Sequence, residues 1–112
     1  MAKEKNGPGG TGMLLLSLLS RRDMYGYEMI EELRRRSNRV FELKAGTLYP
    51  LLHTLEAQGH VTAYDGEAAG RVRRYYRITA GGRAALTEQA AAWNRYAGAV
   101  WEVLGGGDLC GA

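Results

Sequence analysis

The chain has 112 residues, of which 46% are hydrophobic and 24% are charged, and its formal net charge is +3. This length suffices for one domain with a thin core, and the apolar share excludes wholesale disorder. The longest mainly apolar run, Met13–Leu19, is far shorter than the roughly 18 residues of a membrane span, and the start of the chain lacks a convincing secretory signal. We therefore expect no membrane partner.

A single cysteine, Cys110, cannot form an internal disulfide or a zinc site. This favours a reducing, cytoplasmic location, and we expect neither a metal nor a cofactor. In its glycine-rich surroundings Cys110 is either an idle thiol or a redox sensor, and the first reading is the simpler one.

The positive charge lies in the middle of the chain. Residues 21–77 hold eleven basic and eight acidic residues, an excess of three that equals the whole net charge. The arginines cluster at 21–22, 34–39 and 71–77. Arginines at this density can bind phosphates, although any one cluster can also be no more than a solvated face.

Four parts are predicted along the chain: a glycine-rich arm at 1–11, one domain at 12–79, a final helix at 80–104 and a loose tail at 105–112. Within the domain, an apolar helix is predicted at 13–20 and an amphipathic helix at 24–37, followed by a brief extended piece at 41–44. The second helix has Tyr27, Ile30 and Leu33 at helical spacing, which predicts its buried stripe.

A third helix is predicted from about Gly46 or Thr47, because Pro50 has no amide hydrogen and fits best in a first turn. Gly59 is expected to end it. Four leucines at i, i+3, i+4 and i+7 form its buried stripe: Leu48, Leu51, Leu52 and Leu55. The opposite face carries small or hydrogen-bonding groups, which could approach the groove of a duplex closely: Gly46, Pro50, His53 and Ala57, flanked by Tyr49 and Thr54.

Two β-prone runs follow, at 61–64 and 72–78, joined by turn residues 65–70. The second run is rich in arginine. Three helices followed by a basic hairpin are the order of a winged helix-turn-helix. We therefore predict a mainly α fold with a small β-hairpin.

The last helix is predicted from Gly82 to about Leu104, with Thr79 as its cap. Its apolar residues are spaced as a heptad seam, and nothing follows to cover it: Leu86, Ala90, Trp93, Ala97, Val100 and Leu104. Such a helix most simply pairs with a second copy, with Leu86, Trp93, Val100, Trp101 and Leu104 in the dimer interface.

Three blocks of sequence together resemble the PadR family of bacterial transcriptional regulators. They are Tyr-Gly-Tyr-Glu at 25–28, Phe-Glu-Leu-Lys-Ala-Gly-Thr-Leu-Tyr-Pro-Leu-Leu-His-Thr-Leu-Glu at 41–56, and Arg-Tyr-Tyr-Arg-Ile-Thr at 74–79 after Arg73, with Gly82-Arg83 beyond. The likeness covers about residues 12–104. The single last helix is similar to that of the small subfamily, which includes multidrug-sensing repressors.

The resemblance implies a homodimer on a pseudo-palindromic operator in double-stranded DNA, with the third helix in a major groove and the wing at the minor groove. Carried over, the residues that would face DNA are Lys44, Gly46, Thr47, Tyr49, Pro50, His53, Arg71, Arg73 and Arg74. The arginines and Lys44 would set register and affinity, whereas Thr47 and His53 would touch bases. Alternatively, Tyr49 only closes its helix over Tyr75 or Tyr76.

The resemblance also implies a planar aromatic or hydrophobic effector at the dimer interface, beside Trp93. Met13, Ser17, Ala90 and Ala97 would line the same space. Trp93 can equally be ordinary dimer core, and Trp101 is expected to pack against the partner's first helix. The chain departs from the family at the wing tip, 67–70, and in the glycines before Met13, which bear on the reach of the wing and the mouth of the pocket.

The first functional hypothesis is a ligand-responsive transcriptional repressor, in which the effector shifts the dimer toward a state with lower operator affinity. The second is a protein-interaction module that uses the winged helix for docking and has lost DNA binding. A small enzyme is the third, but His53 has no partner acid or nucleophile in its motif. We therefore do not expect an enzyme.

Overall fold

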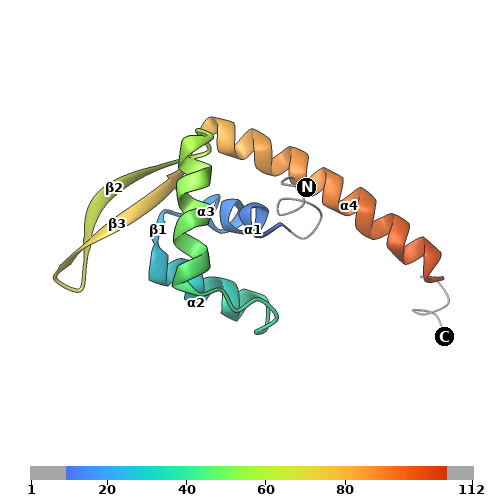
Figure 1. Cartoon of the computed structure of the whole chain (residues 1–112), viewed down its shortest axis with the longest axis horizontal. Helices are drawn as coiled ribbons and strands as arrows, with labels where there is room; N and C mark the ends of the chain where they lie inside the picture. The colour runs from blue at the N-terminus through green and yellow to red at the C-terminus, as the bar shows by residue number, and fades with distance from the viewer. Residues whose placement is uncertain (1–9, 106–112) are drawn as a thin grey trace.

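The structure, a computed structural model, describes residues 10–105 (Figure 1). The expected arm and tail, including Cys110, fall almost wholly outside these residues. Four helices and three strands follow in the order α1 (Thr11–Leu19), β1 (Met24–Tyr25), α2 (Gly26–Arg36), α3 (Ala45–Ala57), β2 (Val61–Ala68), β3 (Arg71–Ile78) and α4 (Ala80–Val103). The strands form one antiparallel sheet in the order β1-β3-β2. The mainly α prediction with a hairpin is thus confirmed, with one short strand added.

The core lies between α1, α2, α3 and the base of the hairpin. Its buried side chains are all apolar, and α1 supplies four of its leucines, which confirms the predicted apolar helix. Burial of this kind is the main favourable term in folding. The members are Leu15, Leu16, Leu18, Leu19, Met24, Met29, Leu33, Leu48, Leu52, Leu55, Val61, Tyr76 and Ile78.

The second helix begins later than predicted. Met24 and Tyr25 are not helical but pair with Tyr76 and Tyr75 of β3, and the Tyr25 amide donates to Glu28 Oε1 at 3.1 Å. The predicted stripe is confirmed at Leu33, which is buried, and Ile30 packs half-buried against the core. Its first member was wrong, because Tyr27 is 60% exposed whereas Gly26 and Met29 are buried. Gly26 has no side chain, so a pattern of apolar side chains could not reveal it.

In α3 the predicted stripe is confirmed: Leu48, Leu52 and Leu55 are buried and Leu51 is half-buried. Gly59 follows the helix with φ +79°, as expected of the glycine after a helix end. The placement of Pro50 in the first turn was wrong. Because α3 begins at Ala45, Pro50 is its sixth residue, and it cannot donate to the carbonyl of Gly46.

The hairpin is longer than predicted. Residues 65–68, expected in the loop, extend β2 and pair with 71–74 of β3. The loop is only Ala69-Gly70, and both residues have positive φ, 53° and 76°, which suits a two-residue hairpin turn. Turn-forming residues such as Asp65 and Gly66 suggested a loop locally, but pairing with β3 overrides that preference.

The cap of α4 is confirmed, since Thr79 Oγ1 accepts from the Gly82 amide at 2.9 Å, although the helix begins at Ala80. Its first turns pack against the core, and its C-terminal part projects beyond the other elements (Figure 1). Leu86 lies against the core of its own chain, so it belongs only in part to an uncovered seam. The exposed apolar residues come later: Trp93, Tyr96, Val100, Trp101, Val103 and Leu104.

Candidate nucleic-acid interface

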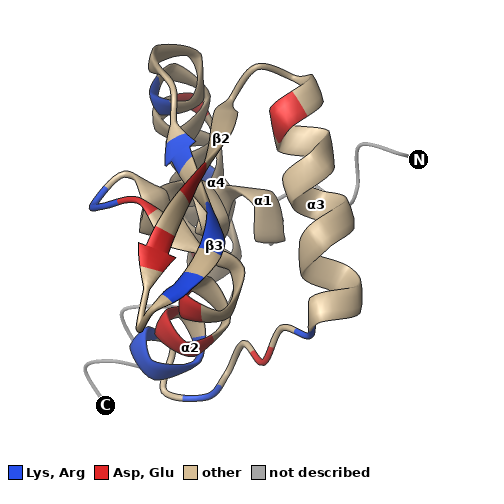
Figure 2. Cartoon of the chain, turned by 90° about the vertical axis from the view of Figure 1, so that its left-hand side faces the viewer, with Lys and Arg blue, Asp and Glu red and all other residues tan. Residues whose placement is uncertain are grey.

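The outward side of α3 is exposed and nearly uncharged. Gly46, Thr47, Pro50 and His53 are all exposed there, and Lys44 stands at the N-cap. Glu56 is the one charged residue within the helix, and Figure 2 shows α3 without charge along the rest of its length. The structure therefore brings these predicted residues onto one side of one helix.

Tyr49 lies on the flank of α3 that faces α2. Its ring and hydroxyl lie over Gly26, so closely that a Cβ at Gly26 would overlap them. The ring is nevertheless 41% exposed. The contact thus ties the first residue of α2 to α3, and it was not among the contacts considered from the sequence.

The opposite flank of α3 borders a cavity of about 440 Å³, which also touches the start of α1. Its lining is uncharged and includes Thr11, Gly12 and Gln58, which were not predicted to belong to a site. None of the three stands in a motif that would have singled it out. The lining is Thr11, Gly12, Gly46, Thr47, Pro50, Leu51, Thr54, Leu55 and Gln58.

The arginines of β3 divide between the two faces of the sheet. Arg74 shares the inner face with Tyr76 and Ile78, and its Nη2 lies 3.8 Å from Glu56 of α3 and its Nη1 3.9 Å from Asp65. Arg71, Arg73 and Arg77 alternate onto the outer face. The predicted basic set is therefore not one continuous patch.

The outer face carries a row of tyrosines bounded by two arginines. The Arg73 guanidinium carbon lies 5.0 Å from the ring centroid of Tyr25, and Arg77 lies 4.9 Å from that of Tyr64. Between them, Tyr75 meets Tyr25 edge-on at 5.4 Å and stacks on Tyr64 at 5.6 Å. Such cation–π and aromatic contacts hold Arg73 and Arg77 against the sheet.

Asp23, in the connector between α1 and β1, also joins this outer face. Its Oδ2 accepts from Tyr64 Oη at 2.5 Å and from Arg77 Nε at 3.0 Å. Partial burial raises the pKa of the Asp23 carboxyl, but the bonds from Tyr64 and Arg77 and the charge of Arg77 outweigh it and hold the pKa below its ordinary value. The sequence reasoning missed Asp23, because its partners lie far along the chain.

The other arginine clusters are largely compensated. Arg34 pairs with Glu31 at 2.5 Å and Arg35 with Glu32 at 2.6 Å, each one turn away. The hydrogen bond from Arg34 is the main cause that lowers the pKa of Glu31, and the positive charge of Arg34 adds to it. This pairing supports the alternative of a solvated face for the cluster at 34–39.

The residues expected around an effector lie on α1 and α4. Met13 and Ser17 are half-buried one turn apart on α1, which contacts α4. Trp93 is 36% exposed, and its ring centroid lies 5.7 Å from that of Tyr96. Ala90 and Ala97 lie one turn to either side of Trp93.

Between residues 10 and 105, no group of three or more histidine, cysteine or acidic side chains could hold a metal ion. Within the same range, no helix is both long and apolar enough to cross a membrane.

Residues 15–88 match the family described as the transcriptional regulator PadR-like family. The chain is 45% identical over 84 residues to "Transcriptional regulator Rv3488" of Mycobacterium tuberculosis, a match that covers 75% of this chain and 73% of the relative. Among solved structures, a transcriptional regulator from Clostridium thermocellum has a TM-score of 0.75 at 31% identity, covering 81% of this chain and 86% of that one.

A PadR family transcriptional regulator from Eggerthella lenta has a TM-score of 0.70 at 31% identity, covering 84% of this chain and 83% of that one. Members of the family are transcriptional regulators and not enzymes; they bind DNA and are typically dimers. By sequence and by fold, the chain belongs to the PadR-like family of transcriptional regulators.

Proposed function

We propose that the chain is a homodimeric repressor that binds a pseudo-palindromic operator and releases it when a planar aromatic or hydrophobic effector binds at the dimer interface. As a regulator of transcription, it would act in the cytoplasm.

The outward side of α3 is the observation that carries DNA recognition. A line of small groups, Gly46 and Pro50 with His53, lets the helix approach base edges without a charged or bulky wall. Thr47 and His53 would read bases. Lys44 would anchor the start of the helix to a phosphate.

The wing would supply phosphate contacts from both faces of β3. Arg71 and Arg73 would act from the outer face, and Arg74 from the inner face beside α3. Tyr49 would contribute indirectly, because its packing over Gly26 holds α3 against α2.

Dimerisation through α4 is supported by the apolar residues on its projecting part. Trp93, Val100, Trp101 and Leu104 are each at least 36% exposed in the single chain. Exposed aromatic and aliphatic side chains in such number favour burial against a second copy. The two copies of α3 would then lie about one helical turn of DNA apart, roughly 34 Å.

A mobility-shift titration on DNA flanking the coding region of the protein tests DNA recognition. A salt-sensitive shift that prefers one sequence is expected, and no such shift would overturn the proposal. His53→Ala should relax base preference, whereas Arg71→Ala should weaken binding to all sequences and reduce the salt dependence. Arg95→Ala, an exposed arginine on α4, is the matched control and should leave binding unchanged.

Quenching of tryptophan fluorescence by a panel of planar hydrophobic compounds tests the effector. Quenching that persists in Trp101→Phe, disappears in Trp93→Ala and accompanies release of DNA is expected. Quenching that depends on Trp101 alone would show that the effector site is wrongly placed.

A further inference from the structure

We propose that Asp23 is a positioning residue for DNA recognition: it holds the wing, β2 and β3 with their turn, at a fixed orientation to the helices. This inference rests on the proposed function, in which α3 and the wing contact DNA together.

A single carboxylate oxygen of Asp23 bridges both strands of the wing. Oδ2 accepts from Tyr64 Oη of β2 at 2.5 Å, and it lies 3.0 Å from Nε and 2.9 Å from Nη2 of Arg77 in β3. The donors are 41 and 54 residues away along the chain. The guanidinium of Arg77 also covers the ring of Tyr64, so the three side chains form one unit.

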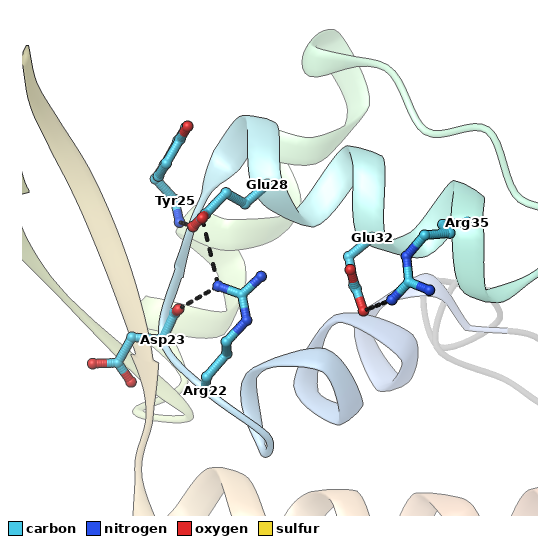
Figure 3. A network of polar contacts seen from close by, with 6 residues as sticks. All are labelled: Arg22, Asp23, Tyr25, Glu28, Glu32 and Arg35. Atoms are coloured by element: carbon cyan, nitrogen blue, oxygen red, sulfur yellow. Dashed lines mark hydrogen bonds and ion pairs between the residues drawn. The ribbon is translucent and has the colours of Figure 1, made fainter. Parts of the chain in front are cut away.

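The connector that carries Asp23 is itself tied to three helices. Ser20 ends α1, and its carbonyl accepts from Arg83 of α4 at 3.4 Å. Arg22 Nη1 reaches Glu28 of α2 at 3.5 Å. Figure 3 shows the contact of Arg22 with Glu28, with the Asp23 carboxylate turned away from Arg22 toward the strands. Because the connector is short, with α1 ending at Leu19 and β1 beginning at Met24, Asp23 links the wing to a point held between these two elements.

Apolar packing anchors the base of the wing, where Val61, Tyr76 and Ile78 are buried in the core. Polar contacts between the wing and the rest of the described chain are few. The strand β1 adds only two residues to the sheet, at Tyr75 and Tyr76. On the inner face, the contacts of Arg74 with Glu56 and Asp65 are long, 3.8 and 3.9 Å, and exposed. Exposed pairs of that length hold a geometry weakly. The short bonds to Asp23 are thus the strongest polar link between the wing and the connector.

The proposal assigns different roles to neighbouring arginines. Arg77 is engaged by Asp23 and serves the wing's orientation, whereas the exposed Arg71 is placed to meet phosphates. If Asp23 acted only through its charge, its removal would have the opposite effect on DNA affinity from the one expected here. Removing its negative charge and releasing Arg77 would then strengthen binding to DNA.

The test compares Asp23→Ala with Asp65→Ala, which removes the same charge from β2 near Arg74. Affinity is measured for a duplex selected by the wild-type chain from a random library and for an unrelated duplex. We expect Asp23→Ala to lose about tenfold in affinity for the selected duplex, the equivalent of one charge-assisted hydrogen bond, although the chain becomes more positive. Asp65→Ala should bind as tightly as wild type or more tightly. Tyr64→Phe, which keeps the charge, should show a smaller loss in the same direction as Asp23→Ala.

Hydrogen exchange of the wing amides gives a readout without DNA. Asp23→Ala should speed exchange in β2 and β3 while the amides of α1 and α3 keep their protection, which separates loss of wing orientation from global unfolding. If Asp23→Ala leaves exchange in the wing unchanged, or binds the selected duplex more tightly as Asp65→Ala does, the role of Asp23 is overturned while the proposed function stands. A wild-type chain that selects no sequence would overturn the proposed function, and the role of Asp23 in recognition with it.

Discussion

The ring of Tyr49 in α3 lies directly over Gly26, the first residue of α2. Any residue with a Cβ at that position would displace the ring. The two helices of the helix-turn-helix are thereby joined at one point. The hydroxyl end of the ring makes the closest approach to Gly26, although the tyrosine as a whole is 41% exposed.

Gly26→Ala should lower the free energy of unfolding by about 1–3 kcal/mol, because the new Cβ displaces the Tyr49 ring. Thermal unfolding measures the effect. Gly46→Ala is the matched control in α3: its Cβ would meet nothing within 4 Å, so stability should stay the same or rise by up to about 1 kcal/mol. In a Tyr49→Ala background the cost of Gly26→Ala should largely vanish, and a persistent cost would contradict this contact as its cause.

Two adjacent glycines, Gly81 and Gly82, lie in the first turn of α4. A Cβ at Gly82 would overlap the backbone carbonyl of His60, and backbone cannot swing aside as a tyrosine ring can. We expect Gly82→Ala to destabilise the chain by about 3 kcal/mol or more, judged by urea unfolding. Gly81→Ala meets only ordinary contacts at 3.6 and 3.7 Å and should be tolerated. Equal effects of the two substitutions would show that α4 is seated differently.

Glu56 should restrain Arg74. Because its carboxylate lies beside the Arg74 guanidinium, Glu56→Gln is expected to raise affinity for duplex DNA of any sequence by roughly two- to fivefold. Fluorescence anisotropy at several salt concentrations measures this. Glu56→Gln also removes repulsion between Glu56 and phosphates, so the same substitution is made in an Arg74→Ala background. A gain of the same size there would mean that Arg74 is not involved.

The projecting part of α4 should carry the dimer. Val100→Asp places a charge on the predicted seam, and sedimentation velocity should then show a shift toward monomer. The matched control is Val103→Asp, since Val103 is 86% exposed and lies off the seam. A dimer that survives Val100→Asp but not Val103→Asp would place the interface on another face of α4.

Asp23 should make stability fall in acid. Its pKa in the folded chain is below the ordinary value of 3.8, so its contribution is fully present above that pH and is lost as pH falls through the lower, folded value. The difference in melting temperature between wild type and Asp23→Asn should therefore be constant near neutral pH and shrink below about pH 4. A difference that does not change with pH would mean that the carboxylate charge is not what Tyr64 and Arg77 recognise.

Local chemistry in the sequence was enough to predict several features. The leucine spacing of α3, the Thr79 cap and the left-handed Gly59 each depend on a few neighbouring residues, and all three are confirmed. The three blocks that resemble PadR regulators also lie within short stretches, and the family is confirmed. The same local rules misjudged the position of Pro50, which lies beyond the first turn of α3. They also made the hairpin too short, because pairing between strands outweighs the turn preference of residues 65–68.

The tertiary structure alone decided which side chains meet. The contact of Arg74 with Glu56, the seat of Tyr49 on Gly26 and the bonds of Asp23 all join residues distant in sequence. Neither periodicity nor composition encodes such contacts, because they arise only when the sheet packs against the helices. The net charge of +3 shows this most plainly: the sequence located its source between residues 21 and 77, and only the fold determined that Arg74 and Arg77 lie beside the distant carboxylates of Glu56 and Asp23.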